Sequence, residues 1–223
     1  MSDALKAAVL DLKMLRPYLK MVPVMLVLGI VMDISMKSGL SFVVLYAATL
    51  IMTLSAYPFG AEEKNRLHLL RLSLPVTRRA IVAGRYLQAA SVSLVFSGIA
   101  FVLSFIASLI AGRAFAPAET ALTALGVCAF ALTVVMFQYP IYYRIGFMKA
   151  RYLVNVPLFL IILLVPQLKA LQSSARGGAP SRLIAFLSAH PMSAVLILLA
   201  SAALLGLLSF LLSYHFFKKK DLS

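Results

Sequence analysis

Long apolar stretches separated by short polar segments make up most of this sequence. Six of them have the length and apolar content to cross a membrane, since a helix that spans the hydrocarbon core needs about 20 mostly apolar residues. They cover approximately residues 19–37, 40–59, 86–111, 118–140, 153–171 and 192–215. Lys20, Pro23 and Asp33 lie in the first stretch and make it the weakest of the six. The pattern predicts an all-α integral membrane protein with six transmembrane helices, or with five if the first stretch does not cross.

The composition excludes a soluble globular protein. Of the 223 residues, 62% are hydrophobic and 13% are charged, whereas soluble domains average about 45–50% apolar and about 25% charged residues. The single cysteine, Cys128, excludes an intramolecular disulfide and a cysteine-based metal site. The three histidines lie far apart in the sequence, so we expect neither a metal centre nor a catalytic site.

Positive charge is concentrated on one side of the predicted topology. If both termini lie inside, 16 of the 21 Lys and Arg residues fall on the inner side and 5 on the outer side. Because Lys and Arg in short loops favour the cytoplasmic side, we predict a multi-pass protein of the cell membrane with both termini cytoplasmic. The net charge of +14 then reflects topology and attraction to anionic membrane lipids, and we expect no nucleic-acid partner.

The segment ahead of the first span, residues 1–17, has the pattern of an amphipathic helix. Apolar side chains recur at helical spacing, namely Leu5, Ala8, Leu12 and Leu15. Pro17 ends or turns this helix. We expect it to lie in the inner membrane interface and to lead into the first span.

The longest inner segment, residues 60–85, separates the second and third spans. Glu62 and Glu63 suit the positive end of a helix dipole, which predicts that a short helix begins near them. The apolar stripe of this helix comprises Leu67, Leu70 and Leu74. Pro75 stops the helix, and Thr77 is a candidate N-cap for a second helix that runs into the third span. A plain connection needs only a few residues, so this segment indicates a docking surface, with interfacial anchoring as the alternative.

Polar groups within the spans are few. Of the seven acidic residues only Asp33 lies in a predicted span, which disfavours an ion-coupled carrier. Tyr46, Thr49 and Thr53 share one face of the second span and are the candidates for lining a pathway, although threonine hydroxyls often bond to carbonyls of their own helix. A face of small residues in the third span predicts close helix packing; it comprises Ser93, Ser97, Ala100, Ser104 and Ser108.

The outer segment, residues 172–191, is rich in Gly, Ser and Pro. This composition predicts an extracellular linker followed by a short helix. The sequence contains no G-x-x-x-x-G-K-[ST] phosphate loop, so we do not expect it to bind ATP by that route.

Two inner segments resemble a known family. Residues 59–87 read FGAEEKNRLHLLRLSLPVTRRAIVAGRYL, which resembles the acidic "D/E-E-K" and following "S-L-P-hydrophobic-[ST]-R" signature of small type-2 ABC transporter permeases. Residues 139–151 read YPIYYRIGFMKAR, which resembles the "P-x-Y-Y-x-x-G" inner loop of the same family. The resemblance extends to the number of spans and the pattern of loops.

The resemblance implies the membrane permease subunit of an ATP-driven ABC exporter. It implies that two six-span subunits, identical or related, form the path, and that separate ABC ATPase subunits bind ATP and Mg while this chain binds no cofactor and is not an enzyme. Residues 1–17 are then the elbow helix, residues 62–73 the coupling helix, and the second and fifth spans line the path. The implied ATPase-coupling residues are Glu62, Glu63, Arg66, Leu67, Leu70, Arg71, Leu74, Arg78 and Arg79.

Two other functions fit a small six-span protein. One is the substrate-binding membrane subunit of a vitamin-type importer, which needs a small-residue docking face on its first span. The other is a membrane scaffold or immunity protein that transports nothing. The position of the docking chemistry, between the second and third spans, favours the permease. Co-purification with a soluble ATPase distinguishes all three.

The predicted topology is tested by cysteine accessibility in intact cells. A membrane-impermeant thiol reagent added outside should label Gly178→Cys and should not label Asn65→Cys or Lys219→Cys, because the last two lie on the charged inner side. Outside labelling of Ser2→Cys, with Lys219→Cys still protected, would show that the first stretch does not cross.

Overall fold

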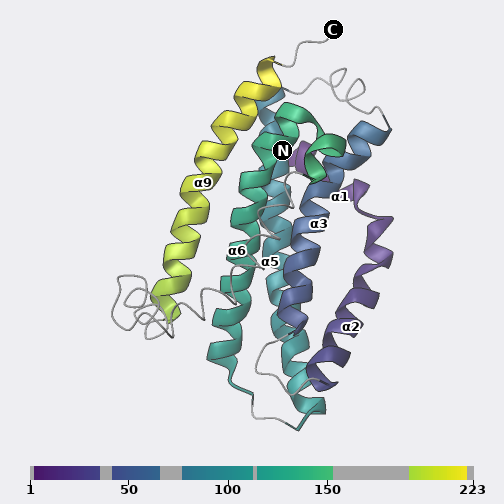
Figure 1. The fold of residues 1–223 in the computed structure, drawn as a ribbon, viewed down its shortest axis with the longest axis vertical. Coiled ribbons are helices and arrows are strands. Elements are labelled where there is room, and N and C mark those ends of the chain that lie inside the picture. The colour runs from purple at the N-terminus through teal and green to yellow at the C-terminus, as the bar shows by residue number, and fades with distance from the viewer. Residues whose placement is uncertain (1–2, 36–41, 66–76, 113–114, 153–190, 220–223) are drawn as a thin grey trace.

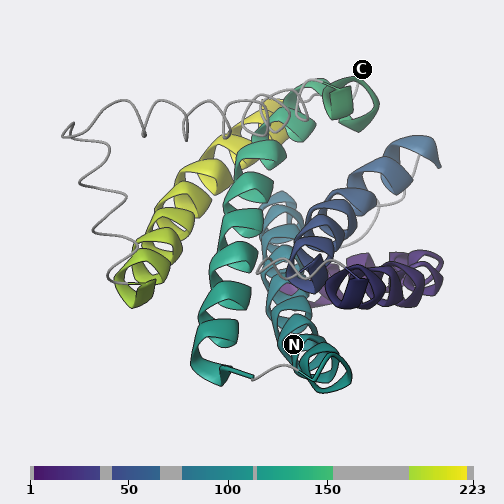
Figure 2. The same cartoon turned by 60° about the horizontal axis from the view of Figure 1, so that its bottom comes forward.

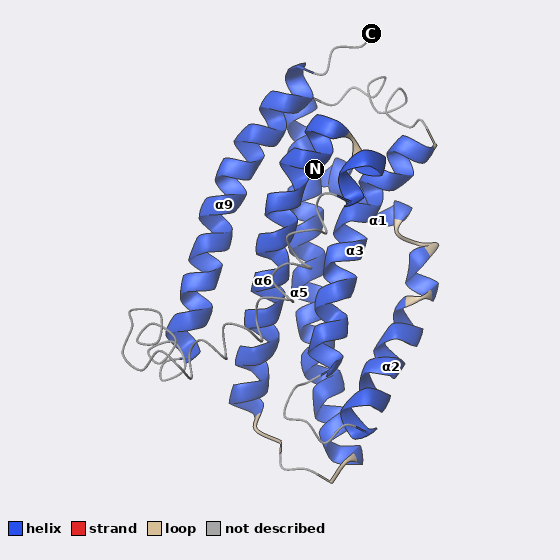
Figure 3. Ribbon diagram, viewed as in Figure 1, coloured by secondary structure: helices blue, strands red, loops and turns tan. Residues whose placement is uncertain are grey.

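The computed structural model describes residues 3–35, 42–65, 77–112, 115–152 and 191–219. Within these ranges all regular structure is helical (Figure 3). The elements are α1 (Asp3–Met14), the short 3₁₀ helix η1 (Tyr18–Lys20), α2 (Val22–Ser35), α3 (Phe42–Lys64), α5 (Arg78–Ile110), α6 (Pro117–Ile145) and α9 (Pro191–Lys219). The prediction of an all-α protein is confirmed for the described residues.

Five helical segments are long and apolar enough to cross a membrane. They are Tyr18–Ser35, Phe42–Lys64, Arg78–Ile110, Pro117–Ile145 and Val195–Lys219. These segments coincide with the first four predicted stretches and with the sixth. The predicted fifth span, residues 153–171, and the linker over residues 172–190 lie outside the described residues, so the count of six remains a prediction.

The long helices run side by side, with α3, α5 and α6 at the centre and α2 and α9 at opposite edges (Figures 1 and 2). The helix α2 packs mainly on α3, and α9 packs mainly on α6. The amphipathic helix α1 lies across one end of the bundle and packs chiefly on α5.

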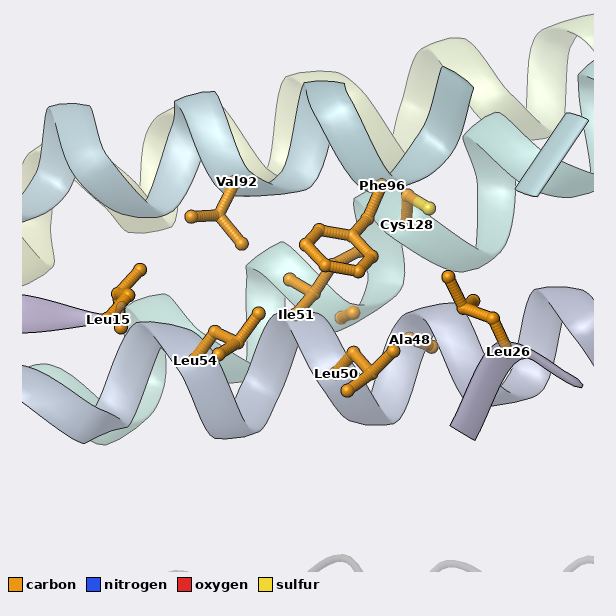
Figure 4. Close-up of a cluster of buried hydrophobic side chains, with 10 residues drawn as sticks. Leu15, Leu26, Ala48, Leu50, Ile51, Leu54, Val92, Phe96 and Cys128 are labelled. Atoms are coloured by element: carbon orange, nitrogen blue, oxygen red, sulfur yellow. The ribbon is translucent and has the colours of Figure 1, made fainter. Parts of the chain in front are cut away.

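Apolar side chains from four helices fill the centre of the bundle (Figure 4). One cluster brings together Leu26 of α2, Ile51 of α3, Phe96 of α5 and Cys128 of α6. Four of the five small residues of the predicted face on α5 are buried, with Ser108 half-buried, and the Ser93 hydroxyl donates to the Cys128 carbonyl oxygen at 3.4 Å. Small side chains let α5 approach its neighbours closely.

Asp33, the acid within the first predicted span, caps a neighbouring helix. Its carboxylate accepts a hydrogen bond of 2.7 Å from the backbone N–H of Phe42, the first residue of α3. The first N–H groups of a helix have no partner within that helix, so the buried carboxylate satisfies one of them and links α2 to α3.

The helices on either side of residues 66–76 are longer than the apolar stretches alone indicate. Thr77 caps α5 as predicted, and its side chain accepts from the Ala80 N–H at 3.3 Å. The expectation that Glu62 and Glu63 begin a short helix is wrong, because both lie in the last turn of α3. Ala, Glu and Lys at the end of α3 are good helix formers, and contacts described below offset the unfavourable position of the acids. Pro140 lies inside α6, which continues to Ile145.

Candidate functional site

The helix α1 crosses α5 at a glycine. A Cβ atom on Gly84 would lie 2.7 Å from the Cβ of Ala7 and 2.9 Å from the carbonyl oxygen of Ala4. Contacts this short are not tolerated between real side chains, so only glycine allows this crossing. The absence of a side chain at Gly84 therefore positions the amphipathic helix on the third membrane-spanning helix.

The next residue, Arg85, joins three helices through buried charges. Its guanidinium forms an ion pair with Glu62 at the end of α3, and its Nε lies 4.0 Å from Oδ2 of Asp11 on α1. Arg85 is 3% exposed and Asp11 is 0% exposed. Removing one partner of a buried pair typically costs about 3–5 kcal/mol, because the other charge stays buried without compensation.

Aromatic rings surround the same guanidinium. The Cζ atom of Arg85 lies 3.9 Å from the centroid of the Phe59 ring and 5.5 Å from that of Tyr143 on α6. Attraction between a cation and the face of a ring is worth about 0.5–2 kcal/mol, more where water is excluded. We call Asp11, Phe59, Glu62, Arg85 and Tyr143 the junction. It connects α1, α3, α5 and α6 at one end of the bundle.

The other acid, Glu63, holds the turn that follows α6. Its carboxylate accepts a hydrogen bond of 2.9 Å from the N–H of Met148. Gly146 ends α6 with a φ of +88°, a backbone conformation that residues other than glycine rarely adopt. On the same surface, Gly60 leaves room for the ring of Phe147, which would lie 2.8 Å from an added Cβ.

The two sequence segments that resemble a permease signature therefore pack against each other. Phe59 opens the first segment, and its ring contacts Tyr139 and Tyr143 of the second at centroid distances of 5.0 Å each. A tilted contact at 5.2 Å joins it to Tyr142 as well. Residues at least 80 positions apart in the sequence, Phe59 and the three tyrosines, thus form one aromatic cluster around Arg85.

Helix α9 is tied to the start of α5 at the same end. The Arg78 Nη1 atom donates to the carbonyl oxygen of Lys218 at 3.2 Å, in the last turn of α9. Further from this end of the bundle, the Tyr86 hydroxyl of α5 lies 2.8 Å from the Ser213 hydroxyl of α9. Arg79 is exposed.

The structure describes four of the nine residues predicted to couple to an ATPase, and three of these make contacts within the chain. Glu62 pairs with Arg85, Glu63 binds the turn after α6, and Arg78 binds α9. The other five lie outside the described residues and comprise Arg66, Leu67, Leu70, Arg71 and Leu74. Intrachain contacts of Glu62, Glu63 and Arg78 show that these residues hold the ends of the segment in place.

The candidate path residues lie on the outward face of α3. Thr49 and Thr53 are exposed and Tyr46 is half-buried. The Thr49 hydroxyl donates to the Tyr46 carbonyl oxygen and the Thr53 hydroxyl to the Thr49 carbonyl oxygen, each at 2.8 Å. The alternative that these hydroxyls bond to their own helix is confirmed, and their role in a path remains a prediction.

Sequence reasoning missed the importance of Asp11, Gly84 and Arg85. On α1 the structure buries Asp11 beside Ala8 and leaves Leu5 and Leu12 exposed, and the expectation that this helix lies in the membrane interface remains a prediction. A carboxylate three residues after Ala8, on the apolar side, was the available signal.

In the described part of the chain, no group of three or more His, Cys, Asp or Glu side chains is arranged to hold a metal ion.

Comparison with known proteins gives one result. The sequence model of a family described as "ABC-2 family transporter protein" matches residues 9–218. Neither the curated proteins nor the solved structures gave a match. The matched range includes the junction and the described helices from α2 to α9, except the last residue of α9.

The close crossing of α1 and α5 is tested by a pair of Gly→Ala variants on α5. Gly84→Ala should lower the stability of the purified protein by about 1–3 kcal/mol, because overpacking forces α1 away. Gly98→Ala is the matched control: an added Cβ there has nothing within 4 Å, and loss of a helical glycine stabilises by about 0.5–1 kcal/mol. Thermal unfolding followed by circular dichroism measures both. Equal effects of the two variants would contradict the crossing.

Proposed function

The chain belongs to the ABC-2 family of transporter membrane proteins, and from this premise we propose that it is the permease subunit of an ATP-driven exporter. The observation that carries the proposal is the family match over residues 9–218, which includes the spans and both inner segments. Membrane subunits of this family generally act with separate ATPase subunits. The same match favours a permease over the substrate-binding subunit of a vitamin importer.

The described contacts support a specific route for coupling. Residues 66–76 connect α3 to α5, and the junction holds both ends of this connection through Glu62 and Arg85. A force that an ATPase applies to residues 66–76 therefore acts on α3 and α5 together. It also reaches α1 through Asp11 and α9 through Arg78.

This route changes the role of the predicted coupling residues. We propose that an ATPase contacts the apolar stripe Leu67, Leu70 and Leu74, together with Arg66, Arg71 and the exposed Arg79. Glu62, Glu63 and Arg78 anchor that surface to the helices. Force generated by an ATPase in the aqueous phase reaches the spans only through a rigid connection, and the buried ion pair of Glu62 with Arg85 makes this connection rigid.

The path itself is proposed to form between two copies of the subunit or between this chain and a related one. The face of α3 that carries Tyr46, Thr49 and Thr53 would then look toward the partner subunit. The chain binds no cofactor under this proposal. ATP and Mg are held by the ATPase subunits.

The docking role of the segment is tested by Leu70→Asp, with Arg71→Glu as the comparison. Burying a Leu contributes about 1.5–3 kcal/mol, and an unpaired carboxylate in an apolar site costs more still. An exposed rim charge contributes only about 0–1 kcal/mol. We expect Leu70→Asp to abolish capture of the ATPase and coupled ATP turnover at unchanged membrane expression, and Arg71→Glu to weaken both modestly.

The control is the purified permease chain without the ATPase, which should show no ATP turnover above a detergent blank. Turnover by the chain alone would overturn the assignment as a transport subunit. Wild-type capture and turnover in Leu70→Asp would remove the docking role and return the segment to interfacial anchoring.

A further inference from the structure

Four cationic residues belong to the elements that meet at the end of the bundle where α5 begins and where α6 and α9 end (upper end of Figure 1). They are Arg78, Arg144, Lys218 and Lys219. Arg78 binds the carbonyl oxygen of Lys218 at 3.2 Å, and the Cζ atom of Arg144 lies 5.6 Å from the centroid of the Phe216 ring. Arginines of α5 and α6 therefore contact the last turn of α9, which itself carries Lys218 and Lys219. We call these four residues the cationic patch.

The acidic side chains near this end of the bundle have other partners. Asp11 and Glu62 pair with Arg85, and Glu63 accepts from the Met148 N–H. Arg78 and Arg144 are held instead by a carbonyl oxygen and an aromatic ring, and neither of these cancels their charge. Within the described residues the patch keeps its positive charge, and Asp221 lies outside them.

The exposed face of α9 that leads to the patch is apolar. Leu204, Leu208 and Leu211 are 65%, 58% and 61% exposed and follow one another at spacings of four and three residues, so they share a face. The exposed side chains of His215 and Lys218 continue the same face. The surface thus changes from hydrocarbon to cation within about two helical turns.

We propose that the cationic patch binds the headgroup phosphate of an anionic phospholipid whose acyl chains lie along the exposed leucine face of α9. The guanidinium groups of Arg78 and Arg144 present N–H donors in a planar fork that matches phosphate oxygens. Lys218 and Lys219 add positive charge, and aromatic residues such as Phe216 are typical of the headgroup level. The site goes beyond the proposed transport function and requires only that α9 lies in a bilayer.

A phospholipid matches this surface better than free phosphate does. Free phosphate would use the cations and leave the leucine face without a role, whereas a lipid uses both parts at once. Anionic lipids are also enriched on the side of the membrane where basic residues collect. Lipid binding at this position would connect α5, α6 and α9, because the cations of the patch come from all three.

The experiment measures thermal unfolding of the purified full chain in detergent, with and without added lipid. Phosphatidylglycerol should raise the Tm of the wild-type protein more than phosphatidylcholine does. Arg78→Gln/Arg144→Gln should lose at least half of this difference. Lys13→Gln/Lys20→Gln removes two exposed cations from the N-terminal segment and should keep most of it. Each variant is compared with itself without lipid, so a change in its basal Tm does not affect the result.

Two results would overturn the site. One is a loss of the lipid effect that is equal in the two double variants, which would show that overall charge alone attracts the lipid. The other is an equal rise in Tm of the wild-type protein with inorganic phosphate, which would show that the patch takes phosphate without the lipid chains.

Discussion

Burial of the Arg85 guanidinium is the constraint on which the end of the bundle where α1, α3, α5 and α6 meet depends. The side chain is 3% exposed, and taking an ion out of water costs several kcal/mol unless opposite charges and hydrogen bonds surround it. Glu62 and Asp11 supply the charges, and Phe59 supplies the ring against which the guanidinium lies. Because these groups come from α1 and α3, neither helix can move away from α5 without exposing an unpaired charge.

That constraint bears directly on the proposed function. Residues 66–76 begin four residues after Glu62 and end two residues before Arg78, so both ends of the connection are held by intrachain contacts. A subunit driven by an external ATPase needs such stiffness, because a compliant connection would absorb the motion. Under the proposed function, Glu62 and Glu63 fix the surface that the ATPase would contact.

The membrane-spanning helices were predictable because their signal is local: length and apolar content alone decide whether a stretch can cross a bilayer. The Thr77 cap was predictable for the same reason, since it depends on neighbouring residues. The junction was not, because it joins Asp11, Glu62 and Arg85 across more than 20 positions at each step. The preference of acids for the start of a helix predicted that Glu62 begins a helix, whereas it lies in the last turn of α3. The ion pair with Arg85 outweighs the helix dipole, which contributes only about 0.3–1 kcal/mol.

The most direct test of the junction is a double-mutant cycle between Glu62 and Arg85, with Glu63 as the matched control. Glu62→Gln, Arg85→Gln and Glu63→Gln are made singly and in pairs, and the free energy of unfolding is measured in detergent. The junction predicts that Glu62→Gln and Arg85→Gln are non-additive by about 0.5–3 kcal/mol, whereas Glu63→Gln and Arg85→Gln add. Additivity of the Glu62 and Arg85 variants would contradict the account.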